Sequence, residues 1–117
     1  MESKQEELRA RTKKFALRVI RLFKNLPRSS EAQILGRQLL RSGTSVGANY
    51  RAAGRARSAA EFSAKIGIVL EEADESVFWL ECLIETGIVK KGASAGSIER
   101  GERTSRNFCG ILQNGSR

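Results

Sequence analysis

Apolar residues between positions 62 and 84 recur at helical spacing over about six turns, and no other feature constrains the fold as strongly. They are Phe62, Ile66, Val69, Leu70, Ala73, Val77, Leu80 and Ile84. Residues three and four positions apart lie on one face of a helix. Ser58 to Glu61 matches a capping box, and Gly87 is a typical helix stop. The pattern predicts a helix over residues 59–86 with one buried face.

Residues 30–57 contain four glycines, yet they also sort by helical position at roughly 100° per residue. One face is apolar and holds Leu35, Leu39, Val46, Tyr50 and Ala53. Nearly opposite lies the arginine face, which consists of Arg37, Arg41, Arg51 and Arg55. Beside the apolar face lies the glycine row, which consists of Gly36, Gly43, Gly47 and Gly54.

The glycine row has a cost that must be offset by packing. Each interior glycine destabilises a helix by about 0.5–1 kcal/mol relative to alanine, so we expect another helix to approach closely along the row. The alternative, a phosphate-binding loop, is disfavoured because the GxxxxGK[ST] spacing is missing and no strand precedes it. We therefore predict one long helix over residues 30–57, which starts at a capping box formed by Ser30 and Gln33.

Two further segments complete the prediction of the fold. Leu8, Phe15, Val19, Leu22, Phe23 and Leu26 have helical spacing, and Pro27 follows them. Ile98, Phe108 and Leu112 can share a face of a helix over residues 94–113, although glycine and serine weaken it. The sequence predicts an all-α protein, a single domain over residues 1–117, with helices at about 4–26, 30–57, 59–86 and 94–113.

The net charge of +8 is unevenly distributed over the 117 residues. Residues 1–58 hold 14 lysines and arginines against 4 acids, residues 59–89 hold 1 against 7, and residues 90–117 hold 6 against 2. A basic region of this kind binds polyanions or pairs with the acidic region of a neighbouring chain. Both interpretations remain open at the level of sequence.

The composition argues against an enzyme. Histidine, the commonest general base and metal ligand, is absent, and a di-metal helical bundle would require it. Cys82 and Cys109 lack metal-binding spacing. We expect no catalytic site, no metal and no cofactor. The polar N-terminus and the absence of a long apolar run predict a cytoplasmic protein that does not contact a membrane.

Basic residues of the first two predicted helices are candidates for binding the phosphates of RNA or DNA. They are the arginine face together with Lys13, Lys14, Arg18 and Arg21. Against this interpretation, no aromatic residue is interleaved with them on the basic faces to stack on bases, since Phe15 and Tyr50 belong to the apolar faces. In the alternative, the arginines pair with the acidic third helix of a neighbouring subunit.

The predicted third helix also carries candidates for a subunit interface. Ile68 and Trp79 lie nearly opposite its core face, among acidic residues that include Glu72 and Glu75. Tryptophan is enriched where proteins meet, so we expect these four residues to contact another copy of the chain.

The run of residues 37–89 resembles one known family. The stretches TSVGANYR, RARS followed by EF, KIGIVLEEADE and FWLE are similar to those of the 23S rRNA-intervening sequence proteins. The resemblance covers about residues 13–91 and implies an up-down four-helix bundle that assembles into a ring-like homopentamer. Two departures are Ala52, where relatives often carry glutamate, and the polar, glycine-rich segment after residue 95.

The resemblance marks a fold family more than an activity. Distantly similar bundle proteins bind nucleic acid as accessories of reverse transcriptases, which favours RNA as the polyanion. The hypothesis is therefore a non-catalytic, oligomeric accessory protein that binds structured RNA, with a nucleic-acid-processing protein as a further partner. The alternative is a structural or adaptor homo-oligomer that binds another protein and no nucleic acid.

Overall fold

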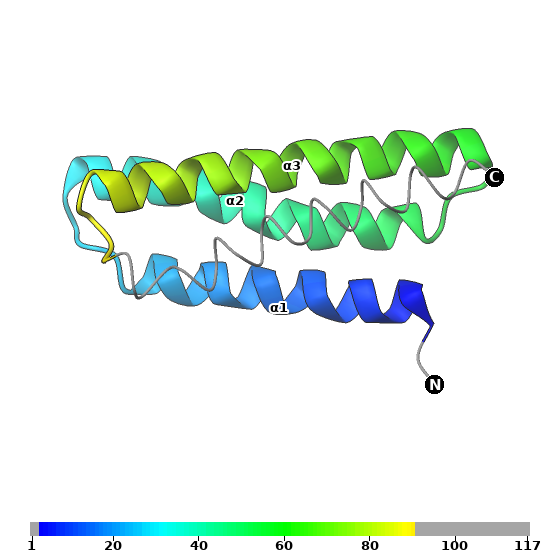
Figure 1. Cartoon of the computed structure of the whole chain (residues 1–117), viewed down its shortest axis with the longest axis horizontal. Coiled ribbons are helices and arrows are strands. Elements are labelled where there is room, and N and C mark those ends of the chain that lie inside the picture. Colours follow the sequence, from blue (N-terminus) through cyan, green and yellow to red (C-terminus); the bar gives the residue numbers. More distant parts are fainter. Residues whose placement is uncertain (1–2, 91–117) are drawn as a thin grey trace.

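The computed structural model describes residues 3–90, which form three antiparallel α-helices (Figure 1). Helix α1 covers Lys4–Lys24, α2 covers Ser30–Ala53 and α3 covers Ala59–Glu85. No strand occurs within residues 3–90, so the all-α class is confirmed. The helix predicted at 94–113 and Cys109 lie outside the described residues.

All three helices begin at a serine whose hydroxyl accepts a hydrogen bond from a backbone N–H of the first turn. Ser3 and Glu6 form a complete capping box, and Ser58 accepts from Glu61 N at 3.1 Å. The cap of α2 is Ser29, one residue before the predicted Ser30. The predicted box does not form because the Gln33 amide donates instead to the Pro27 carbonyl, at 2.9 Å.

Helix α2 is continuous through the glycine row but ends earlier than the sequence predicts. It stops at Ala53, and Gly54 is its C-cap residue. The next two amides bond three residues back, Arg55 N to Ala52 O and Ala56 N to Ala53 O. These turns place Ser58 in the extended conformation from which it caps α3. At the other end of α3, Gly87 has a φ of 79°, a left-handed conformation that suits glycine.

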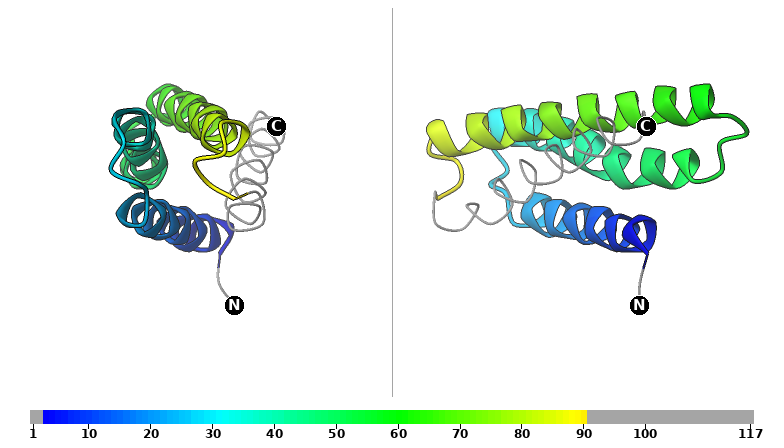
Figure 2. Two further views of the ribbon diagram at one scale, coloured as in Figure 1. Left: turned by 90° about the vertical axis from the view of Figure 1, so that its left-hand side faces the viewer. Right: turned by 45° about the vertical axis from the view of Figure 1, so that its right-hand side comes forward.

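Helix α2 lies between the other two helices (Figure 2) and packs against both, whereas α1 and α3 make no comparable contact with each other. The core is formed by buried side chains from all three helices, among them Leu8, Phe15, Leu39, Val46, Ile66 and Leu80. No helix of the described part of the chain is long and apolar enough to cross a membrane.

The buried face of α3 differs in detail from the predicted one. Ser76 and Leu83 are fully buried, while Val77 and Ile84 are only partly buried. Hydrophobic residues occupy adjacent positions around much of this helix, so periodicity alone could not fix the direction of the core. Ser76 fits the interior because its hydroxyl lies 2.9 Å from that of buried Ser42, in a hydrogen bond between α3 and α2.

Candidate nucleic-acid interface

Three members of the glycine row lie where α2 meets α1. A Cβ atom at Gly36 would lie 2.4 Å from Leu26 Cδ1, and one at Gly43 would lie 2.9 Å from Val19 Cγ2. At Gly47 the nearest atom would be the backbone oxygen of Thr12, at 3.4 Å. The two helices therefore approach closely, with side chains of α1 filling the space that glycine leaves. Gly54 differs from the sequence prediction because it is exposed and its Cβ would meet only the Arg51 carbonyl.

This close approach creates a groove between α1 and α2, which we name the basic groove. Its volume is about 380 Å³, and it is lined by Arg9, Thr12, Lys13, Ala16, Thr44, Gly47, Ala48, Arg51 and Arg55. The residues at its floor are small because the backbones lie close together there. The long side chains of Arg9 and Lys13 rise from α1, and those of Arg51 and Arg55 come from α2 and the turn that follows it. The groove is thus bordered by cations on both sides.

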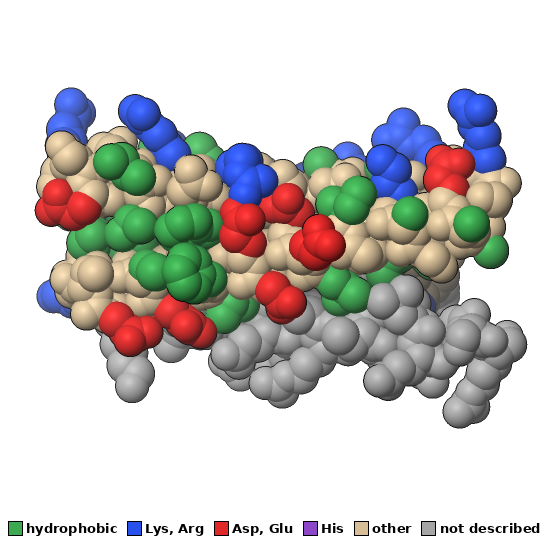
Figure 3. All heavy atoms as spheres, turned by 90° about the horizontal axis from the view of Figure 1, so that it is seen from above, with side chains coloured by type: hydrophobic (Ala, Val, Ile, Leu, Met, Phe, Trp, Pro, Cys, Tyr) green, Lys and Arg blue, Asp and Glu red, His purple; other side chains and the backbone are tan. Residues whose placement is uncertain are grey.

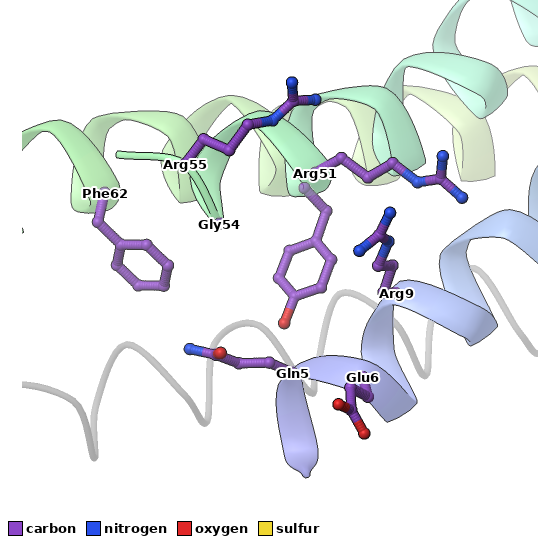
Figure 4. A pocket seen from close by; sticks show the side chains of 8 residues that line it. Gln5, Glu6, Arg9, Arg51, Gly54, Arg55 and Phe62 are labelled. Atoms are coloured by element: carbon purple, nitrogen blue, oxygen red, sulfur yellow. The ribbon is translucent and has the colours of Figure 1, made fainter. Parts of the chain in front are cut away.

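A second cavity adjoins the basic groove and shares three of its arginines. This three-helix pocket has a volume of about 480 Å³ and is lined by Gln5, Glu6, Arg9, Tyr50, Arg51, Gly54, Arg55 and Phe62 (Figure 4). Figure 4 shows Arg9 extending from α1 towards α2, with Phe62 pointing inwards from α3 at the other end. The pocket therefore combines groups from three helices that are far apart in sequence.

The positive charge of these two cavities is not neutralised within residues 3–90. Arg9, Lys13, Arg51 and Arg55 make no ion pair with a described residue. Glu6 is the one acid in the lining of either cavity, and its carboxylate accepts the Ser3 N–H of the capping box. Burial raises the pKa of the Tyr50 phenol, so this side chain is neutral at physiological pH. The four cations outnumber this one carboxylate, and an excess of positive charge attracts anions.

Arg41, a member of the arginine face, has a different role. It pairs with Glu72 at 3.2 Å and with Glu75, both from α3 of the same chain. Desolvation opposes its charge, but attraction and hydrogen bonds to the two carboxylates together outweigh this effect and raise its pKa. The sequence analysis assigned Arg41 to nucleic acid or to a neighbouring subunit. The structure places it in an ion-pair cluster between α2 and α3.

The other predicted basic residues lie outside both cavities. Arg37, Lys14 and Arg21 are exposed, and Arg18 is partly buried, with an Nε atom that has no hydrogen-bond partner in the described structure. Of the eight basic residues in the prediction, the cavities bring together Lys13, Arg51 and Arg55.

Two lining residues were missed by the sequence analysis. Arg9 lies four positions before Lys13, and that spacing puts both on one side of α1. Arg9 could therefore have been predicted from the sequence. Phe62 gave no such signal, because the sequence placed it in the core face of α3, far from the arginines. It is partly buried, and together with Tyr50 it adds an aromatic ring to the lining beside the arginines.

The residues predicted for a subunit interface differ in how much of each side chain is exposed. Trp79 is not fully exposed: it packs against the core, and its indole N–H donates to Glu75 Oε2 at 3.1 Å. Phe78, which the sequence analysis did not select, is 54% exposed, and its ring meets that of Trp79 edge to face with centroids 4.9 Å apart. Ile68 is 38% exposed. Hydrophobic side chains gather at one end of this α2–α3 face (Figure 3).

The sequence and the fold were compared with those of known proteins. A family model described as 23S rRNA-intervening sequence protein matches residues 4–108. The chain belongs to this family. Within residues 3–90, this 23S rRNA-intervening sequence protein has three helices, with α2 between the other two. No curated protein matches the chain.

One solved structure is similar over almost the whole length. It is the crystal structure of a protein with unknown function from the S23 ribosomal protein family of Bacteroides thetaiotaomicron VPI-5482. Its identity to the 23S rRNA-intervening sequence protein described here is 32%, with a TM-score of 0.89, and the match covers 95% of this chain and 99% of that one.

Proposed function

We propose that this protein is a non-catalytic, oligomeric accessory protein that binds structured RNA along the basic groove. The observation that carries the proposal is the convergence of Arg9, Lys13, Arg51 and Arg55 from two helices, with no ion pair to any described residue. Phosphate oxygens are the natural counter-charges for such a row, because each cation that neutralises a phosphate also releases condensed counterions. The printed name of the family, which refers to 23S rRNA, is in line with RNA.

The proposal includes a four-helix bundle that assembles into a ring-like homopentamer, with the fourth helix at 94–113. Helices α1 and α3 both pack on α2 but not on each other, which leaves room beside them for a further helix in a bundle. In the assembled ring, exposed Phe78 and Ile68 would contact another copy. We further propose a cytoplasmic location and a nucleic-acid-processing enzyme as a partner.

The experiment is a measurement of RNA affinity as a function of salt. A hairpin RNA is titrated with the wild-type chain and with the double variant Arg51→Gln/Arg55→Gln, and log K is plotted against log [salt]. Each lost phosphate contact should reduce the slope by about one, so the double variant should have a slope smaller by about two. Affinity should fall for every RNA sequence alike.

A charge-matched control is available in the same chain. Lys24→Gln/Arg28→Gln removes the same charge from exposed positions outside the groove, and its slope should stay close to that of the wild type. Equal slopes for the two double variants would refute the groove as the binding surface. No RNA binding by the wild type at low salt would refute the function.

A second candidate function is an adaptor assembly that binds another protein. The exposed Phe78 ring beside Trp79 supports it, because aromatic side chains are enriched at protein interfaces. Under this candidate Phe78→Ser weakens capture of the partner, whereas Arg51→Gln/Arg55→Gln has no effect. Mass measurement of both variants distinguishes loss of a partner from loss of the oligomer.

A further inference from the structure

The three-helix pocket differs from the basic groove in the chemistry of its lining. The groove offers cations and small residues, whereas the pocket adds an aromatic ring from Phe62, a phenol from Tyr50, an amide from Gln5 and the carboxylate of Glu6, which accepts the Ser3 N–H. Its volume of about 480 Å³ falls within the range of about 300–1,000 Å³ that is usual for pockets that bind small molecules. A phosphate alone would use the guanidinium groups and leave the rest of this lining without a contact.

The lining matches the two parts of a nucleotide. Arg9 and Arg51 border both cavities, so a phosphate held between them would lie at the boundary of groove and pocket. In Figure 4 the Arg9 side chain rises from α1 towards α2 and that of Arg51 runs along α2, while Phe62 lies at the opposite end of the pocket. Aromatic rings stack on bases with little regard to sequence, and the Gln5 amide offers both a donor and an acceptor to a base edge.

We infer that the three-helix pocket binds one unpaired nucleotide, with its base on Phe62 and its phosphate on Arg9 and Arg51. The inference deepens the proposed function and rests on it where the nucleotide is part of an RNA bound in the groove. A free nucleoside monophosphate has the same chemistry. Tyr50 lines the pocket from α2 with a neutral phenol, and the single carboxylate of the lining, Glu6, is outnumbered by three arginines.

The first arm of the test uses small molecules and the full chain. Adenosine 5′-monophosphate, adenosine and inorganic phosphate are titrated separately by calorimetry. The monophosphate should bind at least about tenfold more tightly than either fragment. Phe62→Leu should weaken its binding by roughly 5- to 150-fold, the value of one stacked base, and leave phosphate binding unchanged. Phe62→Tyr keeps the ring and should keep the affinity, which separates stacking from a general loss of folding.

The matched control is Phe78→Leu, which removes an exposed aromatic ring from the same helix but outside the pocket. It should leave the affinity for adenosine 5′-monophosphate unchanged. If the monophosphate and inorganic phosphate bind equally well, or if Phe62→Leu has no effect, the inference is wrong and the pocket is only an anion site.

The second arm identifies the source of the nucleotide and separates the inference from the proposed function. Two hairpin RNAs are compared, one fully paired and one with a single bulged nucleotide. Phe62→Leu should weaken binding of the bulged hairpin only, whereas Arg51→Gln should weaken binding of both. If the monophosphate binds but the bulge gives no advantage, the ligand is a free nucleotide. If both hairpins bind through the groove and neither responds to Phe62→Leu in either arm, the inference fails while the proposed function stands.

Discussion

The two sides of α2 hold their neighbouring helices by opposite means. Towards α1, three glycines bring the backbones together, and the arginines beside the contact have no described ion-pair partner. Towards α3, Arg41 is paired with Glu72 and Glu75, and Ser42 is hydrogen-bonded to Ser76. The difference teaches that arginines predicted to share one helix face can have different surroundings. Arg41 is paired with acids of its own chain, whereas Arg51 and Arg55 have no ion-pair partner among the described residues.

The largest effect is expected when a large side chain replaces a glycine at the contact between α1 and α2. Gly43→Leu places a large side chain where even a Cβ atom would be 2.9 Å from Val19, and valine in a helix has little rotamer freedom to move aside. The free energy of unfolding should fall by about 1–3 kcal/mol, as measured by urea denaturation. Gly67→Leu in α3 is the control, because a Cβ there meets nothing within 4 Å; it should not lower stability and should raise it by about 0.5–1 kcal/mol, the cost of an interior helix glycine.

The hydrogen bond on the opposite side of α2 should give the next largest effect. Ser76→Ala leaves the buried Ser42 hydroxyl without its partner on α3 and should lower the free energy of unfolding by about 1 kcal/mol. The double variant Ser42→Ala/Ser76→Ala should lose clearly less than the sum of the single variants, because each single variant already removes the one hydrogen bond that the two hydroxyls share. Additive losses in the same denaturation series would show that the two hydroxyls act independently.

A smaller effect on stability should distinguish Arg41, which forms ion pairs, from Arg51, which has none among the described residues. Arg41→Gln removes an ion-pair cluster in which the Arg41 side chain is 50% exposed, so it should lower stability by about 0.2–1 kcal/mol and leave the salt slope of RNA binding unchanged. Arg51→Gln should do the reverse. Because the pKa of Arg41 is raised, its charge persists at every pH at which the protein is handled. If Arg41→Gln changes the RNA slope as much as Arg51→Gln, the division between them is wrong.

The smallest expected effect concerns pH. Burial raises the pKa of Tyr50 above its ordinary value, so the folded state retains a proton that the unfolded state loses near pH 10. Stability should therefore be unaffected below that pH and should decline as pH rises from the unfolded pKa to the folded one. Tyr50 is the one tyrosine in the chain, so its phenolate absorbance reports this titration directly. A midpoint at the ordinary value would show that the phenol is solvated.

Much of the fold was readable from the sequence because periodicity and caps are local. The three described helices begin within one residue of their predicted starts, and the core side of α2 was placed correctly through Leu39, Val46 and Tyr50. The end of α2 was not predicted correctly. The helix stops at Ala53 because two turns follow, and these turns are closed by backbone hydrogen bonds that no side chain signals in the sequence.

The candidate site was less predictable because it depends on contacts between helices. Charge showed that the first two helices are basic, but it could not show that Arg41 reaches α3 of its own chain. Nor could spacing show that Phe62 borders the same pocket as Arg9, since these residues meet only when three helices are packed. A sequence lists the groups that are present, whereas the fold decides which of them are neutralised.

The construction of the three-helix pocket has a thermodynamic consequence. Its walls exist together only in the native chain, so a molecule that fills it favours that state over the unfolded ensemble, by about 2.7 kcal/mol when its concentration is a hundred times Kd. An occupant of the groove alone would tie α1 to α2, whereas an occupant of the pocket would also secure the amino-terminal part of α3. The melting temperature should therefore rise as more of the pocket is occupied. Slower amide exchange near Phe62 would show that the pocket is filled and not the groove alone.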